Sequence, residues 1–326
     1  MIRFYKSPQP VTLFSIPLII LILWAQAMPS MAPVVTTDSM LLWKTVAGWF
    51  NGWPNWLNFL LMVSLVSFNA IYLNLVCNKH EVLYKASYLP AFVFALFISC
   101  RPEFLVFHPI HFVNLIFIRV FDKSFSLLKS DSSISSIFDS CFLSSLAALI
   151  YFPAIVILPV MIISISILRS MNFREWIIML IGFILPFFFV SIWMFMKKSA
   201  EEFWTNYIDH YKNIHPRFDL EIGKPLMVLA VLLGFWLLIS VFRLRSNYYK
   251  NIIRTRSVQQ VVFLFLLGSF GSLFLQQKIA LIYFAFLAIP ASILCAYYLL
   301  SEKKRIKFLE IFVWIVVATI VVNHFS

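Results

Sequence analysis

Residues 87–121 read SYLPAFVFALFISCRPEFLVFHPIHFVNLIFIRVF, an apolar stretch that is interrupted by Arg101-Pro102-Glu103. A transmembrane helix needs about 17–25 residues, so this stretch is too long for one span and suits two short ones. Proline removes a backbone donor and disfavours helix in the residue before it. The stretch therefore predicts a hairpin that turns at Arg101–Glu103. Such a break is tolerated in a membrane only where protein or a cavity covers it.

The rest of the chain repeats this pattern. Residues 138–168 predict a second hairpin, broken at Phe152-Pro153, and seven more apolar runs have the length of a single span. The seven runs are 9–27, 56–77, 176–197, 224–243, 260–276, 279–300 and 308–323. Together they predict an all-α polytopic membrane protein with about eleven spans. We expect one integral membrane domain over 1–326, with a module over 1–223 followed by C-terminal helices over 224–326.

The composition supports the same class. The chain has 326 residues, of which 62% are hydrophobic and 12% charged, whereas soluble domains have about 45–50% and about 25%. This excludes a soluble domain, and 36 Phe with 10 Trp exclude intrinsic disorder. The four cysteines are widely spaced, without any pairing typical of a metal site, and are interpreted as small buried hydrophobic residues.

The positive charge indicates orientation. With a cytoplasmic N-terminus, 18 of the 26 Lys and Arg residues fall on the cytoplasmic side and eight outside, which places the C-terminus outside. The net charge of +12 then reflects short loops that contact anionic lipid, and no nucleic-acid partner is expected. Residues 1–27 also resemble a signal peptide ending at Ala25-Gln26-Ala27, and cleavage there would leave ten spans.

Two outer segments could have a function. Trp43, Val46, Ala47 and Phe50 form one apolar face, so Leu41–Phe50 is predicted to lie as a helix on the membrane surface. The second segment covers 198–223. Its Lys212, His215 and Arg217 could clamp a phosphate, although its mixed charges also suit an ordinary surface helix.

Asp38 and Glu103 are the outer acids nearest to the membrane boundary. Two carboxylates from different loops can hold a divalent cation, or act as a base and a metal ligand. In the alternative interpretation, Glu103 pairs with Arg101 and Asp38 points into solvent.

His108, His111 and Asn114 follow at i, i+3 and i+6, which forms a polar stripe leading inward from Glu103. Polar side chains at membrane depth face protein or a wet cavity. The stripe can therefore line a site, with His108 as a catalytic group and His111 as a substrate contact, or it can hydrogen-bond between helices without any chemistry.

This layout resembles the glycosyltransferase-C superfamily over the first ~220 residues. The resemblance rests on Asp38 soon after the first span, the Leu41–Phe50 segment, the broken hairpins and Glu103. The chain also resembles a family of bacterial multi-pass membrane proteins with a start like Phe4-Tyr5-Lys6 and Pro-broken hairpins.

The superfamily resemblance implies an enzyme in the bacterial inner membrane that uses a polyprenyl-phosphate-linked sugar on the periplasmic face. It implies Asp38 as base or metal ligand, Glu103 as second metal ligand, and Lys212, His215 and Arg217 as phosphate contacts. Asp38 stands alone where the superfamily often has an acidic pair, and Pro102 precedes Glu103. Two alternatives stay open: a non-catalytic subunit of an envelope secretion or assembly complex, and a transporter of lipid-linked sugars or small solutes.

Overall fold

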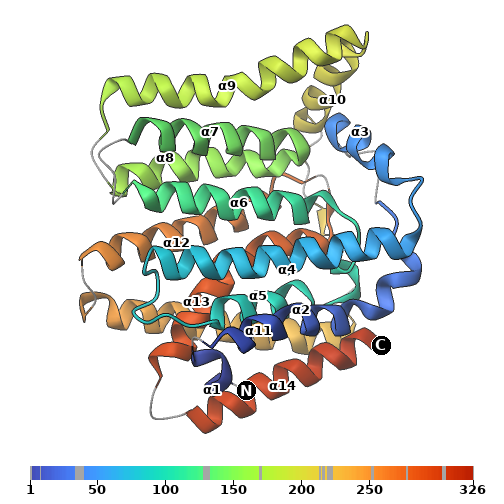
Figure 1. Ribbon diagram of the computed structural model, residues 1–326. Helices are drawn as coiled ribbons and strands as arrows, with labels where there is room; N and C mark the ends of the chain where they lie inside the picture. Colours follow the sequence, from blue (N-terminus) through green and yellow to red (C-terminus); the bar gives the residue numbers. More distant parts are fainter. Residues whose placement is uncertain are drawn as a thin grey trace.

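The computed structural model describes residues 2–7, 9–33, 40–127, 133–168, 171–212, 214, 217–218, 223–250, 253–276, 278–302 and 306–325. Over these residues the chain forms fourteen α-helices, joined by short 3₁₀ helices and one pair of two-residue strands (Figure 1). The α-helices are α1 Ile2–Lys6, α2 Pro10–Trp24, α3 Leu41–Phe50, α4 Asn55–Lys79, α5 Leu89–Ile98, α6 Pro109–Ser126, α7 Ser133–Ile150, α8 Ile157–Leu168, α9 Phe173–Met196, α10 Ala200–Lys212, α11 Lys224–Asn247, α12 Ile253–Leu273, α13 Ala288–Ser301 and α14 Ile306–Phe325. The shorter elements are η1 Ala25–Ser30, η2 Pro102–Phe104, η3 Phe152–Val156, η4 Tyr248–Lys250, η5 Leu281–Leu287, β1 Arg217–Phe218 and β2 Lys278–Ile279.

Both predicted hairpins break at the expected prolines. Helix α5 ends at Ile98, η2 begins at Pro102, and α6 begins at Pro109. Helix α7 ends at Ile150, and η3 begins at Phe152 with Pro153 in its first turn. In each case proline lies where its missing N–H would have no intrahelical partner, so it terminates one helix and starts the next element.

Six helical segments among the described residues are long and apolar enough to cross a membrane. They are Val11–Ser30, Asn55–Lys79, Phe173–Met196, Lys224–Asn247, Leu281–Ser301 and Ile306–His324. Leu89–Ile98, Ile134–Ile150 and Phe152–Leu168 are shorter apolar helices, and α6 carries Arg119, Asp122 and Lys123 in its last turns. The chain is therefore a multi-pass membrane protein, while eleven spans and the orientation stay predictions.

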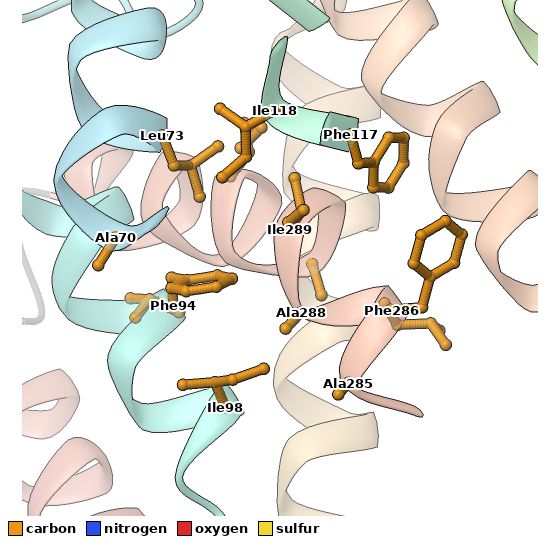
Figure 2. Packing of buried hydrophobic residues seen from close by; sticks show 14 of the residues in the cluster. Ala70, Leu73, Phe94, Ile98, Phe117, Ile118, Ala285, Phe286, Ala288 and Ile289 are labelled. Atoms are coloured by element: carbon orange, nitrogen blue, oxygen red, sulfur yellow. The ribbon is translucent and has the colours of Figure 1, made fainter. Parts of the chain in front are cut away.

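The core lies where α4, α5, α6 and α13 meet (Figure 2). Leu73, Phe94, Ile118 and Ile289 are fully buried there, and the rings of Phe117 and Phe286 stack at 4.8 Å. Helix α13 packs against α5, and α12 packs against α8, so helices after residue 223 share one core with those before it. Helix α9, in contrast, exposes a largely apolar surface that suits contact with lipid.

The two ends of the helix bundle differ. One end, at the right of Figure 1, is covered by short elements and is called the capped end; it consists of η1, α3, η2, α10, β1, β2 and η5. The strands pair in parallel, with Arg217 opposite Lys278 and Phe218 opposite Ile279, and so connect two loops that are distant in sequence. The opposite end, called the basic end, carries the turn after α4, the end of α6 and the turn between α11 and α12.

Helix α3 has the predicted bounds, but its apolar face contacts protein. Trp43 and Ala47 are buried, and the Trp43 ring lies 6.1 Å from Phe107 and 5.8 Å from Phe112 between centroids. Trp49, beside that face, is 70% exposed. The predicted amphipathic face is real, and it holds α3 onto the start of α6.

Candidate functional site

His108 is the N-cap of α6 and brings three segments of the capped end together. Its backbone is extended, as expected before proline, and its Nδ1 accepts a hydrogen bond from the Ile110 N–H at 3.3 Å. Because Nδ1 accepts, Nε2 carries the proton of the neutral ring. The ring centroid lies 6.3 Å from that of Tyr151 and 6.0 Å from that of Tyr283.

Tyr151 and Gln276 extend this cluster inside the protein. The Gln276 amide donates a hydrogen bond to the Tyr151 hydroxyl, and both residues are buried. That hydroxyl keeps its own proton, so it can act as a donor toward a neighbouring group. Neither residue was predicted from the sequence, although the position of Tyr151 directly before the Phe152-Pro153 break is a signal that points to it.

The remaining members of the predicted stripe are fully buried. His111 Nε2 donates to the Phe104 carbonyl at 3.1 Å, and Asn114 Nδ2 donates to the Ala285 carbonyl at 3.3 Å. Asn69 Nδ2 donates to the His111 carbonyl at 3.0 Å. The stripe thus faces protein, and His111 and Asn114 satisfy carbonyls next to the breaks at η2 and η5, where helical bonding is interrupted.

Glu103 lies at the tip of the first hairpin and pairs with Arg101. The two Glu103 oxygens accept from Arg101 at 2.5 Å and 2.8 Å, and Arg101 also donates to Asn323 Oδ1 at 2.9 Å. The Glu103 side chain is nevertheless 43% exposed. A cation at this position would compete with the Arg101 guanidinium for the carboxylate. Asp38 lies outside the described residues, so its pairing with Glu103 stays a prediction.

Both flanks of the segment that carries Asp38 are held by contacts at the capped end. On one side, Pro33 forms a parallel β-bridge with Phe107, the residue before His108. On the other side, Met40 packs in a cluster with Leu149 and Phe152, next to Tyr151.

The second outer segment also folds onto this region. Phe203, Tyr207 and His210 of α10 are buried, the Tyr207 hydroxyl donates to the Ala148 carbonyl, and the His210 ring lies 4.7 Å from Phe152. Of the three predicted phosphate contacts, Lys212 is exposed on α10, Arg217 is placed by its backbone in β1, and His215 lies outside the described residues. His210 was not predicted as a site residue, because it is one of many polar and charged residues in the segment 198–223.

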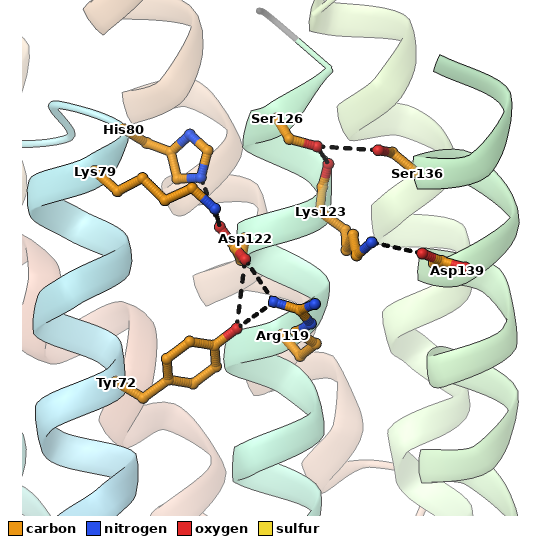
Figure 3. A network of polar contacts seen from close by, with 9 residues as sticks. All are labelled: Tyr72, Lys79, His80, Arg119, Asp122, Lys123, Ser126, Ser136 and Asp139. Carbon is orange, nitrogen blue, oxygen red and sulfur yellow. Dashed lines mark hydrogen bonds and ion pairs between the residues drawn. The ribbon is translucent and has the colours of Figure 1, made fainter. Parts of the chain in front are cut away.

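A second polar cluster lies at the basic end and was not predicted (Figure 3). The Asp122 carboxylate, whose side chain is 5% exposed, accepts from Lys79 at 2.7 Å, His80 at 2.8 Å and Arg119 at 2.8 Å. Burial by itself would raise the Asp122 pKa, but the hydrogen bonds of His80 and Lys79 and the Lys79 charge outweigh it. The pKa therefore lies well below its usual range.

This cluster joins three helices. Asp122 on α6 binds the end of α4, and its neighbour Lys123 pairs with Asp139 of α7 at 2.5 Å. Ser126 and Ser136 add a hydrogen bond of 3.1 Å between α6 and α7. The contacts of this cluster account for a structural role, because both Asp122 oxygens accept from other protein groups.

Within the described part of the chain, no group of three His, Cys, Asp or Glu side chains is arranged to hold a metal ion. The predicted divalent cation therefore depends on Asp38 together with Glu103, and it stays a prediction.

The apolar helices define a multi-pass membrane protein with polar clusters at both ends of its bundle. The chain belongs to a family of unknown function, DUF6427, whose model matches residues 49–326. No curated protein and no solved structure matches the chain.

Proposed function

We propose that the protein is a polyprenyl-phosphate-sugar-dependent glycosyltransferase whose site lies at the capped end, on the outer face of a bacterial inner membrane. The anchoring of both flanks of segment 34–39 carries this proposal. Pro33 is bridged to Phe107, the residue before His108, and Met40 packs in one cluster with Leu149 and Phe152, so both flanks of the segment are held at the capped end. Asp38 is two residues from Met40, a span of at most about 7 Å between Cα atoms.

In the proposed reaction an acceptor hydroxyl attacks the anomeric carbon of the donor sugar. The new C–O bond forms as the bond between that carbon and the phosphate oxygen breaks, and polyprenyl phosphate leaves with the electron pair. Asp38 takes the hydroxyl proton, and the neutral His108 donates its Nε2–H to a substrate oxygen. Lys212, His215 and Arg217 offset the charge on the leaving phosphate, and a divalent cation between Asp38 and Glu103 would add to this effect.

Release of polyprenyl phosphate tests the proposal without knowledge of the acceptor. The full chain in lipid nanodiscs is given polyprenyl-phosphate-glucose and polyprenyl-phosphate-mannose in separate reactions, with a mixed cell-envelope extract as acceptor. We expect release with at least one donor, and a loss of about 100-fold or more in Asp38→Asn, as for removal of a general base. Glu81→Gln removes a carboxylate at the basic end and should leave the rate unchanged. Equal release by wild type and Asp38→Asn would contradict the proposal.

One observation favours a second candidate, a non-catalytic membrane subunit of an envelope complex. The Glu103 carboxylate is already paired with Arg101, and His111 and Asn114 bind backbone carbonyls, which suits a structural role. In that case Asp38→Asn should be tolerated, and the full chain should instead be recovered from mild detergent with stoichiometric protein partners.

A further inference from the structure

A cavity of about 430 Å³ lies at the basic end, between the end of α11 and the start of α12. These helices are consecutive in the chain, both pack against α13, and the end of α11 and the start of α12 lie at the left edge of Figure 1. Its volume falls within the range of about 300–1,000 Å³ that is typical of ligand sites. The cavity is far from the capped end, so it is independent of the proposed transferase site.

The lining changes from apolar to polar along the helix axes. Val241 lies one turn deeper in α11 than Arg245, and Phe263 lies one turn deeper in α12 than Gln259. Tyr248, Tyr249 and Gln260 complete the wall near the helix ends. The apolar part is therefore toward the middle of the bilayer and the polar part toward its surface, which matches the arrangement within a phospholipid.

The polar groups at the mouth are arranged as donors. Gln260 Nε2 donates to the Tyr248 hydroxyl at 2.7 Å, which leaves the hydroxyl proton available to a further acceptor. The Arg256 guanidinium lies over the rings of Tyr248 and Tyr249, with its Cζ atom 5.7 Å and 5.8 Å from the two ring centroids. It also donates a hydrogen bond of 2.8 Å to the Tyr249 carbonyl. It fixes both tyrosines and adds positive charge at the rim.

Arg245 supplies the charge in the wall itself. Two residues earlier on the same helix, Arg243 pairs with Glu302 at 3.1 Å. Among the acidic residues that the structure describes, none pairs with Arg245. An unpaired arginine in a cavity at the membrane boundary selects for an anion, and guanidinium geometry favours phosphate.

We propose that this cavity binds an anionic glycerophospholipid of the surrounding bilayer, with its phosphate at Arg245 and Tyr248 and the first part of its chains against Val241 and Phe263. The lipid fills the cavity between the end of α11 and the start of α12. Phosphatidylglycerol is the probe that represents this class.

Native mass spectrometry of the delipidated full chain in detergent tests the site. Wild type should retain phosphatidylglycerol over phosphatidylcholine, and Arg245→Gln should weaken phosphatidylglycerol binding about tenfold, the usual effect of losing a hydrogen bond to a charged group. Arg243→Gln, with the same charge change on the same helix, is the matched control and should bind like wild type. Addition of inorganic phosphate should not displace the lipid, because the apolar chains contribute to binding.

A second variant tests the contribution of the apolar part of the cavity while the charge of Arg245 is retained. Val241→Trp fills the apolar part, keeps Arg245, and should also lose phosphatidylglycerol. Equal weakening in Arg245→Gln and Arg243→Gln, equal retention of the two lipids, displacement by inorganic phosphate alone, or full binding by Val241→Trp would each overturn the proposal.

Discussion

At the scale of single residues, Asp122 is the charged group on which most of the basic end depends. It accepts from Lys79, His80 and Arg119, so removal of its charge leaves three donors around one buried position. We expect Asp122→Asn to lower the free energy of unfolding by about 2 kcal/mol, less than for a fully buried pair because Lys79 and Arg119 are half-exposed. Unfolding by SDS in mixed micelles measures this. Asp139→Asn removes a carboxylate that, among the described residues, pairs with Lys123 alone and is 36% exposed, against 5% for Asp122, so it should cost below about 1 kcal/mol.

The same carboxylate predicts a pH dependence. The Asp122 pKa is lowered in the folded protein, so the folded state binds fewer protons than the unfolded state near the ordinary pKa of about 3.9. The stabilisation is complete above that value and is lost as the pH falls toward the folded pKa. The difference in melting temperature between wild type and Asp122→Asn should therefore begin to shrink below about pH 5 and continue to shrink as the pH falls toward the folded pKa. A constant difference over this range would contradict the role given to Asp122.

The ion pairs of this cluster could not be predicted from the sequence. Lys79, Arg119 and Lys123 were interpreted only as loop charges that set orientation, because no spacing rule connects the end of α4 with the end of α6. Asp122 was the available signal, since it is an acid among basic residues just beyond the apolar stretch 87–121. In contrast, burial of His111 and Asn114 was predictable, because their helical spacing places both side chains on one face.

At the scale of elements, the close contact of α8 with α12 requires Gly268. A Cβ atom at Gly268 would overlap with the Val160 side chain, so Gly268→Ala should destabilise the protein by about 1–3 kcal/mol. Gly234→Ala in α11 meets nothing within 4 Å and should be neutral or stabilising by up to about 1 kcal/mol. Thermal unfolding in one detergent compares the two. The double variant Gly268→Ala with Val160→Ala should recover part of the loss.

Helix α3 gives a second prediction at this scale. Trp43 is buried against Phe107 and Phe112, so Trp43→Ala should cost about 3–5 kcal/mol and release α3 from the bundle. Limited proteolysis within 40–54 should then become faster. Trp49→Ala removes an exposed ring and should leave the cleavage rate unchanged. Similar cleavage of the two variants would show that the contact with α6 does not hold α3.

The elements also show which sequence signals were sufficient. The bounds of α3 and both hairpin breaks could be predicted, because amphipathic spacing and proline act locally. The residues that α3 contacts could not be predicted. Phe107 and Phe112 are distant in sequence, and an apolar helix face can pack against lipid as well as against protein. The pairing of β1 with β2 was also missed, since two residues carry no alternating pattern.

At the scale of the whole molecule, the capped end is predicted to face the outside of the membrane and the basic end the cytoplasm. The four native cysteines are buried, so cysteines introduced on the surface can be labelled selectively. Asp209→Cys on α10 should react with a membrane-impermeant maleimide in intact cells, and Ser246→Cys at the basic end should react only after permeabilisation. The reverse labelling pattern would show that the orientation is opposite to the predicted one. Reaction of both introduced cysteines in intact cells would exclude the predicted arrangement of eleven spans.

The proposed transferase site requires Asp38 and Glu103 to come together from separate loops, so the distance between these two residues is its most direct test. In the double variant Asp38→Cys with Glu103→Cys, a short bifunctional thiol reagent should link both thiols within one chain, as measured by intact mass. Asp38→Cys with Glu81→Cys, which joins opposite ends of the bundle, should add two separate reagent molecules instead. Two separate additions in the first pair, with both cysteines reactive, would contradict the shared site.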